Sequence, residues 1–236
     1  MILGFLRAVA VLLLTVSCTV AAYLAGFLGL GESAAAGVMA WWGRTFIKVG
    51  GWSVQVEGME NLPAGGAMLV SNHQSLVDIP LFLSAFSRPV RFLSKRELGR
   101  IFLFGRAMAY AGNLFIDRKD PRDAPRMFRE AAARLSAGQL LLVFPEGRRT
   151  RDGSIGAFKT GAFRIALEAG AKVVPVYVDG GYRAMPRGAR AFRQARLLLR
   201  VLPPLSAEEM AGDVKGRVAP AARARILAAA SSEGRG

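Results

Sequence analysis

The sequence predicts an α/β protein with a largely parallel sheet flanked by helices, preceded by an N-terminal helical segment associated with a membrane. After residue 50, short apolar runs alternate with helical patterns, which is typical of a parallel sheet. One of these runs, residues 140–144, is continuously apolar, as in strands that are covered on both faces. The third observation is a stretch of 23 uncharged, mostly apolar residues, 8–30, near the N-terminus.

Residues 1–50 are predicted to be a membrane anchor with two helices. A helix over residues 8–30 would be about 35 Å long, enough to cross the roughly 30 Å hydrocarbon core of a bilayer. Residues 34–52 indicate a helix at the interface, because two basic residues stand one turn apart beside two tryptophans: Arg44, Lys48, Trp41 and Trp42. The alternative is a cleaved signal peptide over residues 1–22. A retained anchor is favoured, because the apolar stretch continues beyond such a cleavage site.

The second predicted domain, residues 51–214, contains the sheet. Trp52, Val54 and Val56 alternate with polar neighbours, which predicts a half-buried strand, and short apolar runs predict the other strands. The predicted strands cover residues 52–56, 67–71, 90–94, 140–144, 172–178 and 195–202.

Helices are predicted between these strands. Ser75 and Asp123 stand where N-cap residues are expected, and Ser206 and Glu209 have the spacing of a capping box. The predicted helices cover residues 75–86, 124–136, 157–169 and a short segment after Ser206. Residues 215–236, which are rich in alanine and arginine, are predicted to be a peripheral tail.

Charge and cysteine content narrow the function classes. The chain has 32 Lys and Arg against 17 Asp and Glu, a net charge of +15, which predicts an anionic partner. The apolar N-terminus favours a membrane surface. No nucleic-acid partner is expected, because the chain has no recognisable nucleic-acid-binding module. Cys18 is the only cysteine, which excludes an internal disulfide and, by cysteine spacing, a structural zinc site.

The only histidine, His73, follows the apolar run at residues 67–71, and Asp78 stands five residues later. Histidine is the side chain whose unperturbed pKa lies near neutrality, so His73 is the first candidate for a general base. Asp78 is close enough in sequence to orient the imidazole. We therefore predict a His73–Asp78 dyad.

Two other segments bring charge to similar places. In parallel sheets, sites form outside the carboxyl ends of strands. Residues 145–151 follow the run at 140–144 with a glutamate and three arginines, and residues 112–118 are a further apolar stretch that ends in charge. Together with residues 72–78, they are expected to form one site.

This set of residues indicates a class of chemistry. A histidine held by a carboxylate can take a proton from a hydroxyl. In hydrolases the hydroxyl belongs to an enzyme serine, but this chain has no GxSxG elbow, so the hydroxyl is expected to belong to the substrate. Guanidinium groups match phosphate with two parallel hydrogen bonds. These features and the membrane anchor indicate acylation of a phosphate-bearing lipid.

Four short blocks resemble those of the glycerolipid acyltransferases. NHQSLVD at residues 72–78 resembles the NHxxxxD block, and GNLFIDR at 112–118 resembles the second block. FPEG at 144–147, followed by Arg149, resembles the third block, and Val-Pro-Val at 174–176 the fourth. The resemblance covers roughly residues 50–180. It implies the glycerolipid acyltransferase fold with a membrane-docking N-terminal segment. It also implies acyl-CoA or acyl carrier protein as the donor substrate, with no metal or other cofactor.

The resemblance also implies roles for single residues. His73 is expected to be the base, and Asp78 to fix its tautomer and stabilise the imidazolium. Arg118 and Arg149 are expected to clamp the phosphate of the acceptor, 1-acylglycerol-3-phosphate, which acylation converts to phosphatidic acid. The other expected substrate-binding residues are Glu146 and Gly147, and those expected to line the site are Asn72, Arg148 and Lys159.

Two alternatives stay open. Arg148 departs from the family pattern, which has threonine there, so another lyso-lipid such as lyso-ornithine lipid is an alternative acceptor. The second alternative is a different class of function, a non-enzymatic anchored protein that binds anionic lipid through the same basic residues. The dyad favours the enzyme, because lipid binding needs neither His73 nor Asp78. The expected location is the inner membrane, with the catalytic domain facing the cytoplasm.

Overall fold

The structure of the chain is a computed structural model that describes residues 2–117, 120, 122–211 and 216–233. The strands are β1 (Ser53–Glu57), β2 (Ala67–Ser71), β3 (Val90–Lys95), β4 (Leu114–Ile116), β5 (Leu140–Val143), β6 (Lys172–Asp179) and β7 (Arg196–Val201). The helices are α1 (Ile2–Phe27), α2 (Glu32–Gly50), η1 (Met59–Asn61), α3 (Asp78–Ala85), α4 (Arg96–Gly99), α5 (Phe104–Tyr110), α6 (Ala124–Ser136), α7 (Gly161–Glu168), α8 (Gly181–Ala184), α9 (Ala207–Ala211) and α10 (Val218–Glu233).

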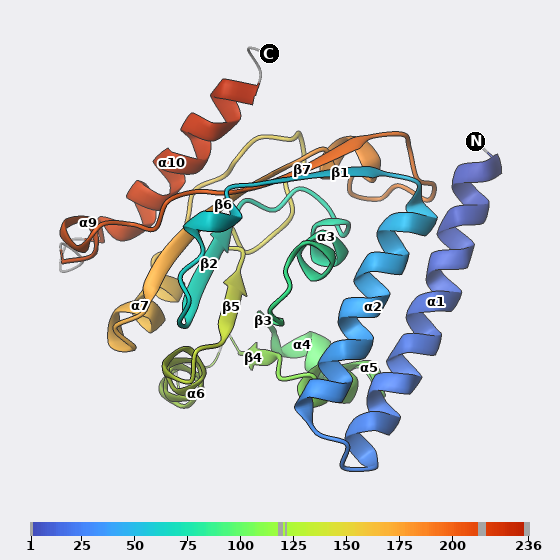
Figure 1. Ribbon diagram of the computed structural model, residues 1–236, viewed down its shortest axis with the longest axis horizontal. Helices are drawn as coiled ribbons and strands as arrows, with labels where there is room; N and C mark the ends of the chain where they lie inside the picture. Colours follow the sequence, from blue (N-terminus) through green and yellow to red (C-terminus); the bar gives the residue numbers. More distant parts are fainter. Residues whose placement is uncertain (1, 118–119, 121, 212–215, 234–236) are drawn as a thin grey trace.

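The strands form one seven-stranded sheet in the order β1-β7-β6-β2-β5-β3-β4 (Figure 1). Every neighbouring pair is parallel except β6 and β7, which run antiparallel. The predicted α/β fold with a largely parallel sheet is therefore confirmed. The central strands β2 and β5 are buried on both faces, in agreement with their continuous apolar sequences.

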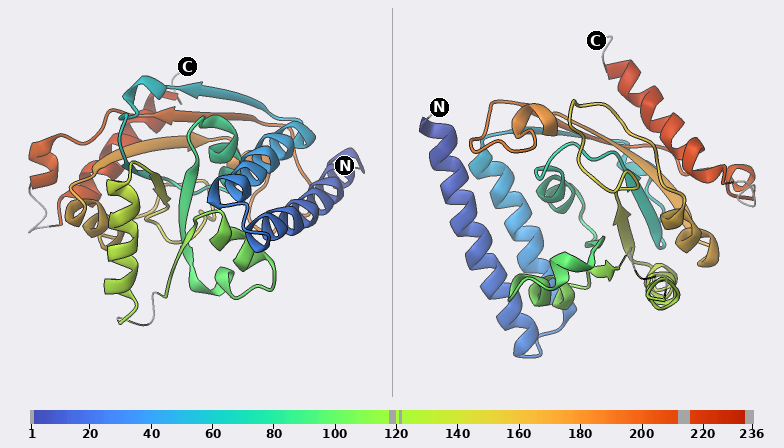
Figure 2. Two further views of the ribbon diagram at one scale, coloured as in Figure 1. Left: turned by 60° about the horizontal axis from the view of Figure 1, so that its bottom comes forward. Right: turned by 180° about the vertical axis from the view of Figure 1, so that it is seen from behind.

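Helices cover both faces of the sheet (Figures 1 and 2). In β2, Ala67 and Leu69 pack in one core with α2 and α3, whereas Met68 and Val70 pack in a second core with α6, α7 and α10. All four side chains are fully buried. The alternation follows from the period of two in a strand. The start of α3 lies near the end of β2 because only residues 72–77 join the two elements.

Helices α1 and α2 lie side by side and antiparallel (Figures 1 and 2). Within the described residues, α1 is the one helix that is long and apolar enough to cross a membrane. At one end of α1, Arg7 donates a hydrogen bond to the Gly50 carbonyl at 3.3 Å, and Gly4 accepts one from the Phe192 N–H at 3.3 Å. Near the other end, alanines of α1 pack against an alanine of α5 and the alanine that caps it: Ala22, Ala25, Ala107 and Ala111. Both ends of α1 thus contact the sheet domain.

Most predicted elements agree with the structure, and four differ. The helix predicted over residues 8–30 covers Ile2–Phe27. The helix predicted from Ser75 begins at Asp78, because the Ser75 N–H binds the Asp78 carboxylate and its hydroxyl donates to the Met185 carbonyl. The helix predicted over residues 157–169 begins at Gly161. The C-terminal segment is not peripheral, because Ala222 and Ile226 of α10 are fully buried against the sheet.

Candidate active site

The predicted dyad forms at the carboxyl end of β2. His73 lies in the turn after the strand, and Asp78 is the first residue of α3. Nδ1 of His73 is 2.7 Å from Oδ2 of Asp78, and the same oxygen accepts the backbone N–H groups of Gln74 at 2.7 Å and Ser75 at 2.9 Å. The Asp78 side chain is 1% exposed and that of His73 is 15% exposed. The turn therefore wraps around a buried carboxylate and leaves the imidazole partly open.

The imidazole is also held by the loop after β5. The ring of Phe144 stacks on it with centroids 3.9 Å apart and planes 13° apart, and the Thr150 N–H donates to the His73 carbonyl at 2.9 Å. Sequence reasoning did not assign a role to either residue. Phe144 stands in the FPEG block, which was the available signal, whereas a backbone contact such as that of Thr150 has no signature in the sequence.

Glu146 links two loops. Its Oε1 accepts the His73 N–H at 2.9 Å, and its Oε2 accepts the Gly156 N–H at 3.0 Å. Burial raises the pKa of this carboxyl above its ordinary value, although the two backbone hydrogen bonds oppose the shift. Gly147, with φ at +76°, makes the turn that follows, and its N–H donates to the Phe144 carbonyl. Both carboxylate oxygens are thus occupied, and a contact of Glu146 with the acceptor stays a prediction.

Asn72 is buried and bridges two strands. Its amide group donates to the Val178 carbonyl and accepts the Val178 N–H, both at 2.9 Å. This pair extends the contact between β2 and β6 by one residue beyond the end of β2. The side chain holds the turn in place, so its polar atoms are already used and do not line the open part of the site.

The loop after β5, which binds the His73 backbone, also carries cations. Arg149 is half-buried and Arg148 is exposed, in the same loop whose Glu146 and Thr150 bind the His73 backbone. Within the described part of the chain, the side chains of Arg149 and exposed Lys159 have no hydrogen-bond or ion-pair partner. They are available to an anion. The remaining predicted residue, Arg118, lies outside the described residues.

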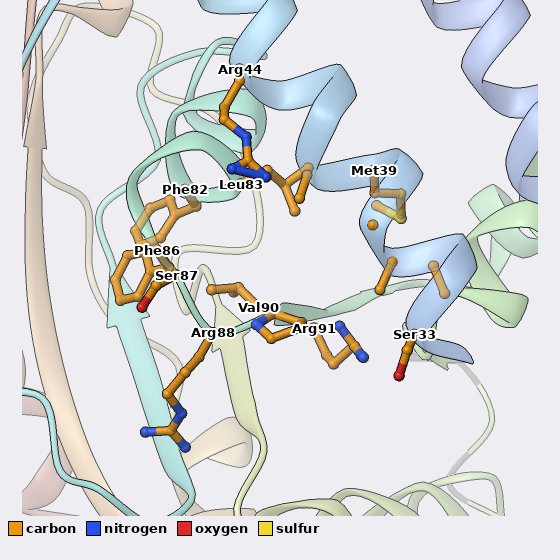
Figure 3. A pocket seen from close by; sticks show the side chains of 15 residues that line it. Ser33, Met39, Arg44, Phe82, Leu83, Phe86, Ser87, Arg88, Val90 and Arg91 are labelled. Atoms are coloured by element: carbon orange, nitrogen blue, oxygen red, sulfur yellow. The ribbon is translucent and has the colours of Figure 1, made fainter. Parts of the chain in front are cut away.

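Two of the cavities beside α2 are lined in part by residues of the sheet domain. One has a volume of about 440 Å³ and mostly apolar walls, which include Leu76 and Ile79 from the segment that carries the dyad and Leu12 and Thr19 from α1. The other, of about 180 Å³, lies between α2 and the turn before β3, where Arg44 is one of its walls (Figure 3). None of the predicted site residues is among the walls of either cavity. Leu76 and Ile79, however, bring the apolar cavity next to the segment that carries the dyad.

These features define the chemistry of the site. A carboxylate-held imidazole can accept a proton, neighbouring arginines can bind an anion, and the adjoining cavity can take an alkyl chain. Such a site suits the transfer of an acyl group to a hydroxyl of an anionic lipid.

Comparisons with known proteins agree with this class. The family model described as Acyltransferase matches residues 53–179, more than half of the chain. The chain therefore belongs to this acyltransferase family, as its sequence blocks predicted.

Similar proteins carry a more specific name than the family model. "1-acyl-sn-glycerol-3-phosphate acyltransferase LPAT1, chloroplastic" of Arabidopsis thaliana is 38% identical over 140 residues, which cover 58% of this chain and 39% of that protein. "1-acyl-sn-glycerol-3-phosphate acyltransferase alpha" of Ovis aries is 34% identical over 191 residues, 79% of this chain and 67% of that protein. The chain thus spans about two fifths of the length of the plant protein.

The fold agrees over nearly the whole chain with a solved structure. The crystal structure of the 1-acyl-sn-glycerophosphate (LPA) acyltransferase PlsC from Thermotoga maritima superposes with a TM-score of 0.72 and 26% sequence identity. The match covers 97% of this chain and 98% of that one, so it includes the N-terminal helices as well as the sheet.

Proposed function

We propose that this chain transfers a fatty acyl group from an acyl thioester to the free hydroxyl of 1-acylglycerol-3-phosphate, which gives phosphatidic acid. The observation that carries the proposal is the His73–Asp78 dyad, because the bond at Nδ1 leaves Nε2 as the nitrogen that can accept a proton. The acceptor is supported by the names of the relatives and by the unpaired Arg149 in the loop bound to His73. The donor is acyl-CoA or acyl carrier protein, and the chain's own residues supply the catalysis without a cofactor.

The reaction follows from this geometry. Arg149, together with Arg118, binds the acceptor phosphate and places its hydroxyl near Nε2 of His73. Nε2 takes the proton while the acceptor oxygen bonds to the thioester carbonyl carbon. The carbon–sulfur bond then breaks, and the imidazolium returns the proton to the departing thiolate. Asp78 stabilises the imidazolium between these steps, so no covalent acyl-enzyme is required.

We also propose that α1 lies in the plane of the membrane rather than across it. Both ends of the helix contact the sheet domain, through Gly4 at one end and Ala25 at the other. Exposed apolar residues recur every three or four positions along one side of the helix, and further exposed apolar residues flank this row toward the N-terminus. The row is Leu6, Val9, Leu13, Val16, Val20, Leu24 and Phe27, and the flanking residues are Ile2, Leu3, Phe5 and Leu12. One face thus meets lipid and the other meets protein, as in an interfacial helix.

This arrangement supports a retained N-terminal segment. Cleavage near residue 22 would remove most of α1, including the Arg7 contact and part of the wall of the apolar cavity. A helix that holds one leaflet keeps the dyad and the cavity next to the acceptor, which is itself a membrane lipid. We place the enzyme on the cytoplasmic side of the inner membrane, where acyl-CoA and acyl carrier protein are found.

The test is an assay of the purified full chain in detergent micelles. The substrates are 1-acylglycerol-3-phosphate, a lyso-ornithine lipid and other lysolipids, each with both donor types. We expect transfer to the phosphate-bearing lysolipid and none by His73→Ala, since no second histidine can act. The matched control is Arg164→Ala, because this side chain is 64% exposed and lies on α7.

The outcomes separate the proposals. Normal turnover by a folded His73→Ala protein would exclude the mechanism. Transfer to lyso-ornithine lipid alone would keep the mechanism and change the acceptor.

A further inference from the structure

An exposed apolar turn joins α4 and α5. We call residues 98–103 the α4–α5 turn. Its large side chains point outward: Phe102 is 84% exposed, the highest value among the exposed large hydrophobic residues, Ile101 is 50% exposed and Leu98 is 39% exposed. Single exposed apolar residues are ordinary, but three within five positions of one turn form a patch that needs a partner.

The α4–α5 turn is held in a strained shape. Leu103 is the one described non-glycine residue with positive φ, at +60° with ψ at −51°, and the Phe104 N–H donates to the Phe102 carbonyl at 2.7 Å. These values define a γ-turn of the rare, strained kind. A Cβ on Gly105 would lie 2.1 Å from the Gly99 carbonyl oxygen, so the turn closes tightly on itself. Strain of this kind persists where the surrounding structure fixes it, often at functional sites.

The surroundings of the turn indicate which partner covers it. Leu98 and Phe104 share the walls of the apolar cavity with Leu12 and Thr19 of α1, so the turn and α1 border the same cavity. Figures 1 and 2 show α5 beside α1, and α4 packs against α5. The turn therefore lies next to α1, on the side of the cavity, and the opposite face of α1 is the one proposed to meet lipid.

Positive charge around the α4–α5 turn also favours a lipid bilayer as its partner. Arg100 lies in the turn and Arg106 in the first turns of α5, and both are exposed and unpaired within the described residues. Arg96, at the start of α4, is 45% exposed beside Asp117. Apolar side chains between arginines match a bilayer with anionic head groups, because the former enter the acyl region and the latter bind phosphate.

We infer that the α4–α5 turn is a second membrane contact, a preformed wedge that inserts Ile101 and Phe102 into the bilayer beside α1. An in-plane helix alone leaves the domain free to roll about the helix axis. A second contact away from that axis fixes the roll, and so fixes which side of the shared cavity faces the lipid. The inference rests on the proposed docking of α1.

The test uses fluorescent probes in the full chain. The native cysteine is first removed by Cys18→Ala. A polarity-sensitive fluorophore is then attached to a single cysteine introduced by Phe102→Cys, by Leu13→Cys on the lipid-facing side of α1, or by Arg122→Cys. Residue 13 is 63% exposed and the side chain of residue 122 is 91% exposed, so the three labels start from open positions. The probe membranes are phosphatidylglycerol–phosphatidylcholine vesicles with nitroxide groups on the acyl chains.

We expect the labels at 13 and 102 to be quenched by the acyl-chain nitroxides and shielded from aqueous iodide, and the label at 122 to show the reverse. If the label at 13 is quenched by lipid while the label at 102 stays accessible to iodide, as the label at 122 does, the wedge is overturned and the docking of α1 stands. A label at 102 shielded from iodide but not quenched by lipid points to a second copy of the chain and also overturns it. Absence of lipid quenching at 13 and 102 removes the docking proposal itself.

Discussion

The effect of Asp78→Asn depends on a detail of the dyad. One oxygen, Oδ2, accepts His73 Nδ1 and the backbone N–H groups of Gln74 and Ser75. Backbone N–H groups can bind only an acceptor, so the amide oxygen of an asparagine will take the Oδ2 position. Nδ1 then keeps its proton and its bond, and Nε2 stays the base. The substitution therefore removes the negative charge without changing the tautomer.

The magnitude follows from that difference. A hydrogen bond to a charged group contributes about 1.5–3 kcal/mol and a neutral one about 0.5–1.5 kcal/mol. Loss of the charge should therefore raise the barrier by about 1–2 kcal/mol, which is roughly 5- to 30-fold in kcat. A dyad forced into the wrong tautomer would lose far more, on the order of 10⁴-fold as in the asparagine variant of a serine-protease triad.

The assay is thiol release from acyl-CoA at saturating acceptor, with thermal unfolding measured on the same samples. Asp78→Ala is the matched comparison, because it leaves the Gln74 and Ser75 N–H groups buried without an acceptor and should lower stability by about 1–3 kcal/mol for each. An Asp78→Asn protein that is folded and as inactive as His73→Ala would refute this interpretation of the turn.

Three further changes test other parts of the site. Arg149→Ala should raise KM for the phosphate-bearing acceptor roughly 10- to 150-fold, since a charge-assisted contact contributes about 1.5–3 kcal/mol, and an unchanged KM in substrate titrations would place the phosphate elsewhere. Gly181→Ala would put a Cβ 2.5 Å from Oδ1 of Asp78, so the carboxylate would have to move. We expect a lower kcat and a loss of about 1–3 kcal/mol of stability in thermal melting. Full activity would show that the dyad tolerates this movement of Asp78. Burial raises the pKa of Glu146 above its ordinary value of 4.5, so this group stabilises the fold below that pH and the contribution is lost as the pH rises through the folded pKa. Urea titrations between about pH 4 and about pH 7 give the free energy of unfolding of the wild type and of Glu146→Gln. The value for the variant should rise relative to that of the wild type as the pH increases, and a constant difference between the two would contradict the raised pKa.

Elements with a local signature were predictable from the sequence. The bounds of β2 and α6 agree with the apolar run and the helical stripe that predicted them. The capping box at Ser206 and Glu209 is confirmed in both directions, with hydrogen bonds of 2.6 and 3.2 Å. These features depend on neighbours within a few positions, which a sequence displays directly.

Features that depend on distant contacts were not predictable. The antiparallel direction of β7 has no signature, because a strand shows the same alternation in either direction. Helices α4 and α5 were missed because they have only 4 and 7 residues, too few to show the apolar stripe of an amphipathic helix.

The candidate site divides in the same way. The five-residue spacing of His73 and Asp78 predicted their contact, which is confirmed at 2.7 Å. The roles of Glu146 and Asn72 as links were not visible, since their partners lie 10 to 106 positions away and are all backbone groups. A sequence indicates which side chains can do chemistry, but it does not show which of them are already bound.

The pairing of β1 with β7 has a consequence for how the chain folds during synthesis. Ser53 pairs with Arg196, so β1 has no partner until some 143 further residues have been made. Helices α1 and α2 leave the ribosome long before the sheet can close, and they carry much of the exposed apolar surface. Early binding of these helices to a bilayer would protect that surface during the slow formation of non-local contacts, whereas synthesis without membranes should favour aggregation.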